Sequence, residues 1–265
     1  DGYLAWVDHV LQVRETANTT LDGIDYDFRV FDDPNELRNV IEQRNRRANK
    51  ARLVAGYCWD WKSKKDPGSF DIELPEHDFR ARWNLDKHGA KWLIAQDSIS
   101  EIGCIHTCQG LELDYVGVII GDDFVIRDGV AVTNAGARSK SDRSVRGYKK
   151  RLKEDRESAL ADADMIIKNT YRTLMTRGMK GCYVYSADAE TREHFRSFAE
   201  TQITEQTDEV SAQPVPYEVV DYESATPYDG FVPLYDLQAA AGEFSEFQLP
   251  AEEGQWVNLP EHFAT

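Results

Sequence analysis

The stretch Tyr115–Gly121, YVGVIIG, is apolar throughout and is typical of a β-strand that is covered on both faces. Shorter runs at Tyr26–Phe31, Arg52–Tyr57, Gly103–His106 and Gly181–Ser186 also predict strands, from alternating or continuous apolar residues. Helical patterns lie between these runs. Because strands alternate with helices, the sequence predicts an α/β fold, a three-layer domain with a mostly parallel sheet.

Four segments of the sequence predict helices. Residues 3–14 carry apolar residues at helical spacing, and Asp33 followed by Pro34 marks the start of a second helix. Residues 146–176 are expected to be helical with a break near 162–164, and residues 187–203 predict a final helix. Residues 58–100 are expected to form an inserted hairpin or a long loop, and residues 124–132 are expected to form a hairpin.

Composition divides the chain into four parts. Residues 1–25 hold the leading helix and a connector, and residues 26–203 hold the sheet domain. Residues 204–230 contain three Pro, seven acids and no Lys or Arg, which predicts an acidic linker because like charges resist compaction. Residues 231–265 are too short for a core of their own. In an alternative interpretation the acidic stretch covers the basic segment 138–156 as a lid, although exposed ion pairs contribute only about 0–1 kcal/mol each.

The net charge of −16 belongs to the end of the chain. After Arg196 there are 14 acidic residues and no Lys or Arg, so residues 1–196 carry 31 basic against 33 acidic residues, a net of −2. Within this body, residues 138–156 hold nine Lys or Arg against three acids. The charge of the whole chain therefore does not exclude a nucleic-acid partner for the body.

The cysteines and the hydropathy of the sequence limit the classes of protein to which this chain can belong. The four cysteines lie among apolar residues without CxxC spacing, which argues against a structural zinc site and favours a reducing, cytoplasmic location. We expect no metal site: Cys104 and Cys108 are four residues apart, but only His106 lies near them. No stretch approaches the roughly 18 apolar residues of a membrane-spanning helix. The start of the chain lacks both the features of a secretory signal and an initiator Met, so we expect it to begin within a longer protein.

The first segment with chemical information is Ile105–Gly121, IHTCQGLELDYVGVIIG. It resembles motif V of superfamily 1 helicases, in which a polar loop ending in Gly-x-Glu joins two strands. In that family the loop faces both the nucleic acid and the nucleotide. The resemblance implies that His106 and Thr107 approach a nucleic-acid phosphate.

The same resemblance implies nucleotide contacts for the end of the loop. Gln109 and the backbone of Gly110 would lie near the ATP phosphates, and Glu112 near the ribose. The alternative is a plain strand–turn–strand in which Gly110 only permits a tight turn.

The second segment is Lys168–Gly181, KNTYRTLMTRGMKG, which precedes a predicted strand. It resembles motif VI of the same superfamily, whose Arg reaches across a domain interface to the γ-phosphate. Arg177 is the residue that matches, and a guanidinium suits the role because it is a planar fork that stays charged. Arg172 contacts phosphate or simply pairs with an acid. The alternative for the whole segment is a helix end with a favourable basic residue and a Gly stop.

The wider sequence resembles the Schlafen group 3-like DNA/RNA helicase domain family, over roughly residues 3–200. This resemblance implies the second, C-terminal RecA-like domain of a P-loop NTPase helicase. The chain has no GxxxxGK[ST] phosphate loop, which family members carry in a preceding domain. ATP with Mg²⁺ is therefore expected to bind mainly to that preceding RecA-like domain, and this chain alone is expected to show no ATPase activity above background.

Two further features favour a nucleic-acid partner. Trp59 and Trp61 flank Asp60 and could stack on bases, although aromatic residues after a strand more often pack in a core. The basic segment, with Lys149, Lys150 and Arg151 at its centre, could follow a phosphate backbone. The alternative is a solvated helix face.

The end of the chain has a resemblance of its own. The segment FVPLYDLQAAAGEFSE…WVNLPEHF, within residues 231–265, resembles the opening of repressor-like, self-cleaving serine peptidase domains of the LexA type. The nucleophile and the Lys base of such domains do not follow it, so no protease activity is expected from this chain.

The leading hypothesis is that the chain is the C-terminal half of an ATP-dependent helicase or translocase. It would supply the arginine finger and part of the cleft for ATP and single-stranded nucleic acid. Two other hypotheses belong to different classes: a nucleotide-gated switch in a defence or regulatory protein, and a non-enzymatic interaction module. The sequence does not distinguish DNA from RNA and does not give polarity, duplex unwinding or oligomeric state.

Overall fold

A computed structural model gives the fold of this chain. It describes residues 2–84, 91–93, 95–108, 110–199, 218–221, 231–233 and 255–258. The chain divides into two compact units, residues 1–204 and 205–265. None of the helices in the described ranges combines the length and the apolar character that crossing a lipid bilayer requires.

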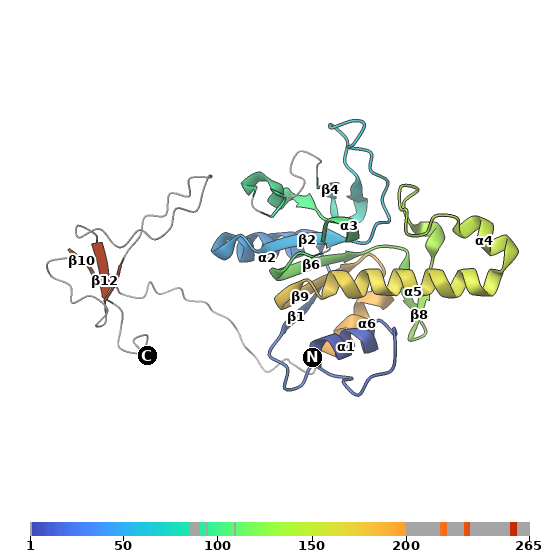
Figure 1. Ribbon diagram of the computed structural model, residues 1–265, viewed down its shortest axis with the longest axis horizontal. Helices are drawn as coiled ribbons and strands as arrows, with labels where there is room; N and C mark the ends of the chain where they lie inside the picture. Colours follow the sequence, from blue (N-terminus) through green and yellow to red (C-terminus); the bar gives the residue numbers. More distant parts are fainter. Residues whose placement is uncertain are drawn as a thin grey trace. The chain divides into compact units, whose positions relative to one another are not determined.

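The first unit is built on a four-stranded parallel sheet (Figure 1). Its order is β1 (Asp27–Phe31), β9 (Gly178–Ser186), β6 (Leu113–Ile120) and β2 (Ala51–Ala55). β6 lies inside the sheet and is buried from Val116 to Ile120, as expected for an apolar strand covered on both faces. The predicted α/β fold with a mostly parallel sheet is confirmed.

Helix α2 (Pro34–Ala48) covers one face of the sheet. The carboxylate of Asp33 accepts a hydrogen bond from the backbone N–H of Asn35 (2.8 Å) and so caps the helix, as the sequence predicts. Ile41 packs against the middle of β6, where a Cβ on Gly117 would lie 2.8 Å from Ile41 Cγ1. The glycine therefore allows α2 to approach the sheet closely.

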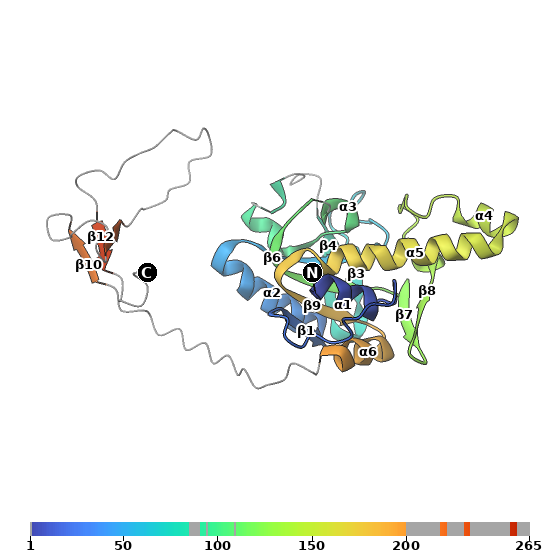
Figure 2. The same cartoon turned by 60° about the horizontal axis from the view of Figure 1, so that its bottom comes forward.

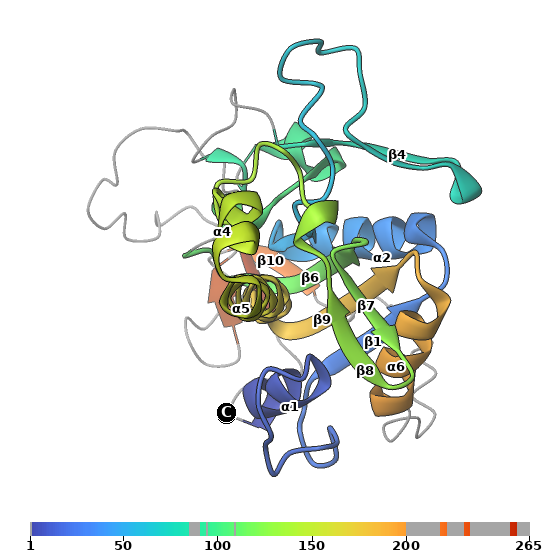
Figure 3. The same ribbon diagram turned by 90° about the vertical axis from the view of Figure 1, so that its right-hand side faces the viewer.

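Helices α1 (Gly2–Val10), α5 (Arg156–Met175) and α6 (Ala189–Ala199) cover the opposite face. Figure 3 shows α2 on one side of the sheet and α1 and α5 on the other. A single buried cluster joins these three helices to the side chains of β6 and β9 that point toward them. The unit therefore has three layers, helices on both faces of a sheet.

The segment between β2 and β6 forms a small sheet of its own, with the order β3-β4-β5. These strands are β3 (Ile72–Leu74), β4 (Phe79–Trp83) and β5 (Glu101–Ile102), with the short 3₁₀ helices η1 (Pro75–His77) and η3 (Gln96–Ser100). The hairpin expected within residues 58–100 is present as β3 and β4.

The strand predicted at Gly103–His106 is wrong. Gly103 makes only an isolated bridge to Val54, and the chain turns at once into the short helix α3 (Ile105–Cys108). The hydroxyl of Thr107 accepts a hydrogen bond from the backbone N–H of Cys104 (2.8 Å) and donates one to its carbonyl (2.9 Å). This local capping favours a helix over a continued strand.

The hairpin expected at residues 124–132 is formed by β7 (Phe124–Arg127) and β8 (Val130–Thr133), and the 3₁₀ helix η4 (Ala135–Ala137) follows it. The helical segment then breaks at Asp155, between α4 (Tyr148–Glu154) and α5, and not near residues 162–164 as predicted. The Asp155 carboxylate accepts from the N–H of Ser158 (3.1 Å) and caps α5. Figures 1 and 2 show α4 and the start of α5 extending beyond the sheet.

The second unit contains a three-stranded antiparallel sheet with the order β10-β12-β11. Its strands are β10 (Glu218–Asp221), β11 (Phe231–Pro233) and β12 (Gln255–Asn258). β10 falls within residues 204–230, so part of the expected linker pairs with a strand from the appended segment. The other residues of the expected linker, and most of the peptidase-like segment, lie outside the described residues.

Candidate nucleic-acid groove and arginine site

Two parallel strands, β2 and β6, end at the same edge of the sheet, and a groove of about 1340 Å³ lies beyond it. Ligands of open α/β sheets commonly bind outside the carboxyl ends of the strands. We call this the carboxyl-edge groove. Its lining comes from three parts of the chain, residues 57–65 with Asp71 after β2, His106 on α3 and residues 135–149 after β8.

The groove is strongly basic at its surface. Seven exposed Lys and Arg side chains line it: Lys62, Lys64, Lys65, Lys140, Arg143, Arg146 and Lys149. Only three acids share the lining, and two of these, Asp71 and Asp142, are buried. Lys62 is paired with Glu73 (3.1 Å). The exposed surface of the groove therefore carries a net positive charge that suits a phosphate backbone.

Two aromatic side chains share this groove with the cations. Trp59 and Trp61 are partly exposed, and both line it. The indole N–H of Trp61 donates to the hydroxyl of Ser63 (3.1 Å), and the Lys64 ammonium lies 5.0 Å from the centre of the Trp61 ring. The structure thus brings the two tryptophans to the basic segment, while base stacking on them stays a prediction.

Asp60 joins the segment that carries the two tryptophans, residues 57–65, here called the tryptophan loop, to residues 138–149, here called the basic loop. Its carboxylate accepts from the hydroxyl of Ser139 (2.8 Å) and from the backbone N–H of Lys140 (3.0 Å). These two hydrogen bonds hold the pKa of Asp60 below its ordinary value. The backbone N–H of Ser139 also donates to the carbonyl of Tyr57 (2.9 Å). The two sides of the groove are therefore linked before any ligand binds.

The three basic residues predicted at the centre of the basic segment differ in their surroundings on α4. Lys149 is exposed, lines the groove and makes no ion pair within the described part of the chain. Lys150 lies 3.7 Å from Glu154, and Arg151 forms a 2.6 Å ion pair with Asp162. The structure therefore brings Lys149 to the groove and pairs its two neighbours with acids outside it.

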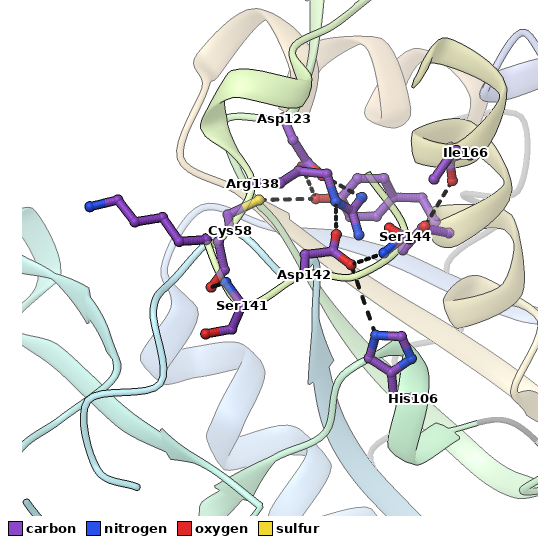
Figure 4. A network of polar contacts seen from close by, with 12 residues as sticks. Cys58, His106, Asp123, Arg138, Ser141, Asp142, Ser144 and Ile166 are labelled. Carbon is purple, nitrogen blue, oxygen red and sulfur yellow. Dashed lines mark hydrogen bonds and ion pairs between the residues drawn. The ribbon is translucent and has the colours of Figure 1, made fainter. Parts of the chain in front are cut away.

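A buried charge cluster lies beneath the groove (Figure 4). The side chain of Arg138 is 0% exposed and bridges the equally buried carboxylates of Asp123 and Asp142. Its Nη1 is 3.0 Å from Asp123, its Nε donates to Asp142, and its Nη2 has no hydrogen-bond partner among the described residues. Burial raises the pKa of Asp123. Burial alone would lower the pKa of Arg138, but the two carboxylates raise it above its ordinary value.

The cluster continues on both sides. The Tyr171 hydroxyl, from α5, donates to Asp123 and accepts from the backbone N–H of Gly121 (2.9 Å). On the other side, His106 Nε2 lies 3.9 Å from Asp142, and Figure 4 shows the imidazole facing that carboxylate. His106 is half exposed at the groove. Thr107, its predicted partner in phosphate contact, instead uses its hydroxyl to cap α3.

The opposite, amino-terminal edge of the sheet brings the two motif segments together. The carbonyl of Arg177 accepts from the N–H of Leu113 (2.9 Å), where β6 begins. The Arg177 guanidinium donates from Nε to the carbonyl of Thr173 (3.0 Å) and from Nη1 to that of Leu111 (3.4 Å). It forms no ion pair within the described ranges. Arg177 is thus held in place by backbone oxygens and has no carboxylate partner in the part of the chain that the structure describes.

The remaining motif V residues lie in the loop that leads to this edge. Gly110 has φ of +76°, a left-handed conformation that favours glycine, and a Cβ there would meet no atom within 4 Å. Glu112 is exposed and makes no hydrogen bond or ion pair with another described residue. Gln109 lies outside the described residues. The structure therefore places Gly110 and Glu112 at the edge where Arg177 lies, and His106 at the groove.

Comparison with known proteins identifies the family of this chain. The Schlafen group 3, DNA/RNA helicase domain matches residues 1–188. The chain belongs to this family. It is also 29% identical over 170 residues to an uncharacterized protein of Saccharomyces cerevisiae, YPL245W, a match that covers 63% of this chain and 36% of the yeast protein. No solved structure matches the chain significantly.

The family match leaves the end of the chain unassigned. It stops at residue 188, and no comparison supports the resemblance of residues 231–265 to repressor-like peptidases. The family assignment therefore rests on the first unit, where the groove and Arg177 lie.

Arg172, the weaker candidate of this helicase domain, pairs with an acid. Its guanidinium binds Asp8 on α1, whose side chain is 1% exposed and also pairs with Arg14 (2.7 Å). Burial alone would raise the pKa of Asp8, but the two guanidinium groups hold it below the ordinary value. Of the two alternatives for Arg172, phosphate contact or an acidic partner, the structure shows the second.

The thiols of the helicase domain are not arranged as a metal site. All four cysteines are free, and burial raises the pKa values of Cys108 and Cys182 to about 12. Across the described ranges, no three or more His, Cys, Asp and Glu side chains are grouped so that they could hold a metal ion.

Sequence reasoning missed two parts of the site. The lysines at 62, 64 and 65 were not expected in the groove, although the run KSKK directly after Trp61 is a usable signal. The cluster of Asp123, Arg138 and Asp142 was missed because Arg138 was counted with the exposed basic segment. The side chain of Arg138 is buried because two carboxylates compensate its charge.

Proposed function

We propose that this chain is the second RecA-like half of an ATP-dependent helicase or translocase and that the carboxyl-edge groove binds single-stranded nucleic acid. One observation carries the proposal: the basic loop, the two tryptophans and His106 of motif V line a single groove. Membership in a DNA/RNA helicase domain family supports it.

The chemistry of the groove favours a single strand over a duplex. Exposed cations attract phosphates of either form, but Trp59 and Trp61 offer ring faces that only unpaired bases can stack on. The loops that carry the cations and the rings are joined through Asp60. A strand can therefore place its phosphates on the basic loop and its bases on the tryptophan loop.

Arg177 is proposed as the arginine finger. Its side chain fits a phosphate because it keeps its charge, is oriented by two carbonyl oxygens and lacks a carboxylate partner in the described part of the chain. ATP with Mg²⁺, when bound, supplies the phosphoanhydride bond whose hydrolysis drives the motor. The nucleotide would be held mainly by a preceding RecA-like domain of the same protein, with Gly110 and Glu112 beside it.

In this proposal the two edges of the sheet act in one cycle. Arg177 stabilises the negative charge that develops on the transferred phosphate, which requires the preceding domain to close against the amino-terminal edge. The groove keeps hold of the strand while that closure and the following opening move the two domains along it.

The groove assignment is tested by removing its cations and comparing them with matched ones outside it. The variant Arg143→Ala/Arg146→Ala/Lys149→Ala removes three charges from the groove. The control Lys150→Ala/Arg151→Ala/Lys153→Ala removes three charges from the same region that do not line it. Binding of a labelled single-stranded oligonucleotide is measured by fluorescence anisotropy over a range of salt concentrations.

The two triple variants are expected to differ. The groove variant loses affinity, and its slope of log K against log salt falls by roughly 0.7 per lost phosphate contact, about 2 in all. The control keeps a slope close to that of the wild type. Equal slopes for the two variants would show that the groove does not hold the strand.

A further inference from the structure

A chain of polar contacts runs from the carboxyl-edge groove to helix α5. Asp142, beneath the basic loop, binds Arg138; Arg138 binds Asp123; and Asp123 accepts a hydrogen bond from the hydroxyl of Tyr171. The backbone N–H of Ser144 donates to Asp142 (2.9 Å), which ties the basic loop directly to the cluster. The contacts connect the surface that faces the groove with the core of the domain.

The path continues along α5 to the amino-terminal edge. Tyr171 lies in the last turns of the helix, and the carbonyl of Thr173 accepts the hydrogen bond from Arg177 Nε. A Cβ on Gly56 would lie 1.9 Å from the Tyr171 hydroxyl, so this hydroxyl is packed tightly against the end of β2. Asp123 is therefore bonded to the same helix, α5, whose Thr173 carbonyl accepts from Arg177.

Stability is a weak explanation for such a cluster. Buried ion pairs are frequently no more stabilising than apolar residues of similar size, because desolvation offsets their attraction. Directional hydrogen bonds instead fix the relative positions of the side chains in the cluster, because each side chain orients the next one. Nε and Nη1 of Arg138 each reach a carboxylate, whereas Nη2 has no hydrogen-bond partner among the residues that the structure describes.

We infer that Asp123, Arg138 and Tyr171 are positioning residues that transmit occupancy of the groove to Arg177. A strand that binds the basic loop shifts Asp142 and Arg138, and α5 responds through the bond between Asp123 and Tyr171. This inference rests on the proposed function, since it concerns how nucleic acid stimulates ATP hydrolysis. It assigns that coupling to one buried network of this chain.

The test uses the full-length protein that contains this domain and a variant that removes one oxygen atom. Tyr171→Phe deletes the hydroxyl between Asp123 and Gly121, which also lies 4.0 Å from the thiol of Cys58 in the groove lining, and it replaces neither a groove residue nor Arg177. Tyr183→Phe is the matched control. Tyr183 is also 0% exposed and its hydroxyl also binds a carboxylate, Asp27 (2.5 Å), but it belongs to the core on the α2 face.

Three quantities are measured for each protein: basal ATPase rate, ATPase rate with saturating single-stranded oligonucleotide, and oligonucleotide affinity. Tyr171→Phe should keep the basal rate and the affinity while the stimulation factor falls about fivefold or more, within the usual range of coupling between sites. Tyr183→Phe should keep all three. If both variants lose stimulation equally, or if Tyr171→Phe keeps it, the inference is wrong.

Two further results distinguish failure of this inference from failure of the proposed function and from misfolding of the variant. If the wild type shows no stimulation by any single strand, the proposed function itself fails, whatever the variants do. If Tyr171→Phe does not fold, Asp123→Asn replaces it, because an amide keeps the shape of the carboxylate while it weakens the bond to Arg138. Retained stimulation in a folded Asp123→Asn protein would equally overturn the inference.

Discussion

The two edges of the parallel sheet differ in how they hold positive charge. At the carboxyl edge, seven exposed cations line one groove, and the one buried guanidinium there is matched by two carboxylates. At the amino-terminal edge, the guanidinium of Arg177 is oriented by two carbonyl oxygens. A row of exposed cations suits a long ligand with repeated negative charges, such as a phosphate backbone. An oriented guanidinium such as that of Arg177 suits a reaction in which charge develops on one phosphate group.

The largest effect on this contrast between the two edges is expected from the removal of Arg177. In the intact protein, Arg177→Ala should lower kcat for ATP hydrolysis by about 10³-fold while ATP affinity changes much less, because the lost contact acts on the transition state. Arg177→Lys should rescue little, since an ammonium is not a bidentate fork. Steady-state ATPase kinetics and direct nucleotide binding measure the two effects.

Lys180 supplies the control for that experiment. It lies two residues from the start of β9, is exposed and pairs with Asp114 (2.9 Å). Lys180→Ala should leave turnover unchanged. An Arg177→Ala protein with wild-type turnover would contradict the arginine-finger assignment.

The second prediction concerns the tryptophan loop. Trp61→Ala should weaken binding of a single-stranded oligonucleotide about tenfold, in line with roughly 1–3 kcal/mol for each stacked base. Trp61→Phe should lose less, because a ring face remains. Anisotropy titrations at fixed salt measure both, and unchanged affinity in Trp61→Ala would mean that Trp61 serves only packing.

The third prediction separates structure from ligand contact at Arg172. Arg172→Ala should lower the free energy of unfolding by about 1–3 kcal/mol, because buried Asp8 loses one of its two partners. Urea denaturation measures the loss. ATP affinity of the intact protein should not change. The opposite result, unchanged stability with weakened ATP binding, would show that Arg172 contacts the nucleotide.

The smallest expected effect concerns the link between the two groove loops and its dependence on pH. The pKa of Asp60 is lower in the folded chain than its ordinary value, so its carboxylate stabilises the fold at neutral pH. The wild type should therefore exceed Asp60→Asn in urea midpoint at pH 7. The difference should decrease as the pH falls below the ordinary value of about 3.9 and vanish once the pH is below the lowered pKa of the folded chain. A difference that persists in acid would have another cause.

Much of the sheet could be predicted from the sequence because its strands carry a local signal. β6 from Tyr115 to Ile120 and β9 from Gly181 to Tyr185 are apolar runs, and α2 begins with a capping Asp and a Pro. The predicted strand Gly103–His106, which includes the start of α3, is wrong because the three apolar or small residues Gly103, Cys104 and Ile105 mask the capping role of Thr107. The break between α4 and α5 was misplaced, because Asp162 and Asp164 suggested a turn. These two acids instead pair outward with Arg151 and Lys168 while α5 continues.

The sequence predicted single residues of the site from local motifs. It did not predict which segments of the chain come together in the groove. His106 and Arg177 were found from local patterns that a loop and a helix end impose. The meeting of the tryptophan loop with the basic loop depends on Asp60 reaching Ser139, 79 residues away in sequence. No periodicity reports such a contact. Arg138 looked like a solvated cation because its burial against Asp142, four residues away, and Asp123, 15 residues away, depends on the fold.

The distribution of indole rings gives this domain a built-in optical signal. Trp6, Trp83 and Trp92 are at most 2% exposed, whereas Trp59 and Trp61 are partly exposed in the groove. Emission from the buried rings should stay at short wavelength and respond little to ligands. A base stacked on either groove ring should quench its fluorescence. Occupancy of the groove can then be followed without a label and in real time, including the dwell of a strand during each round of nucleotide turnover.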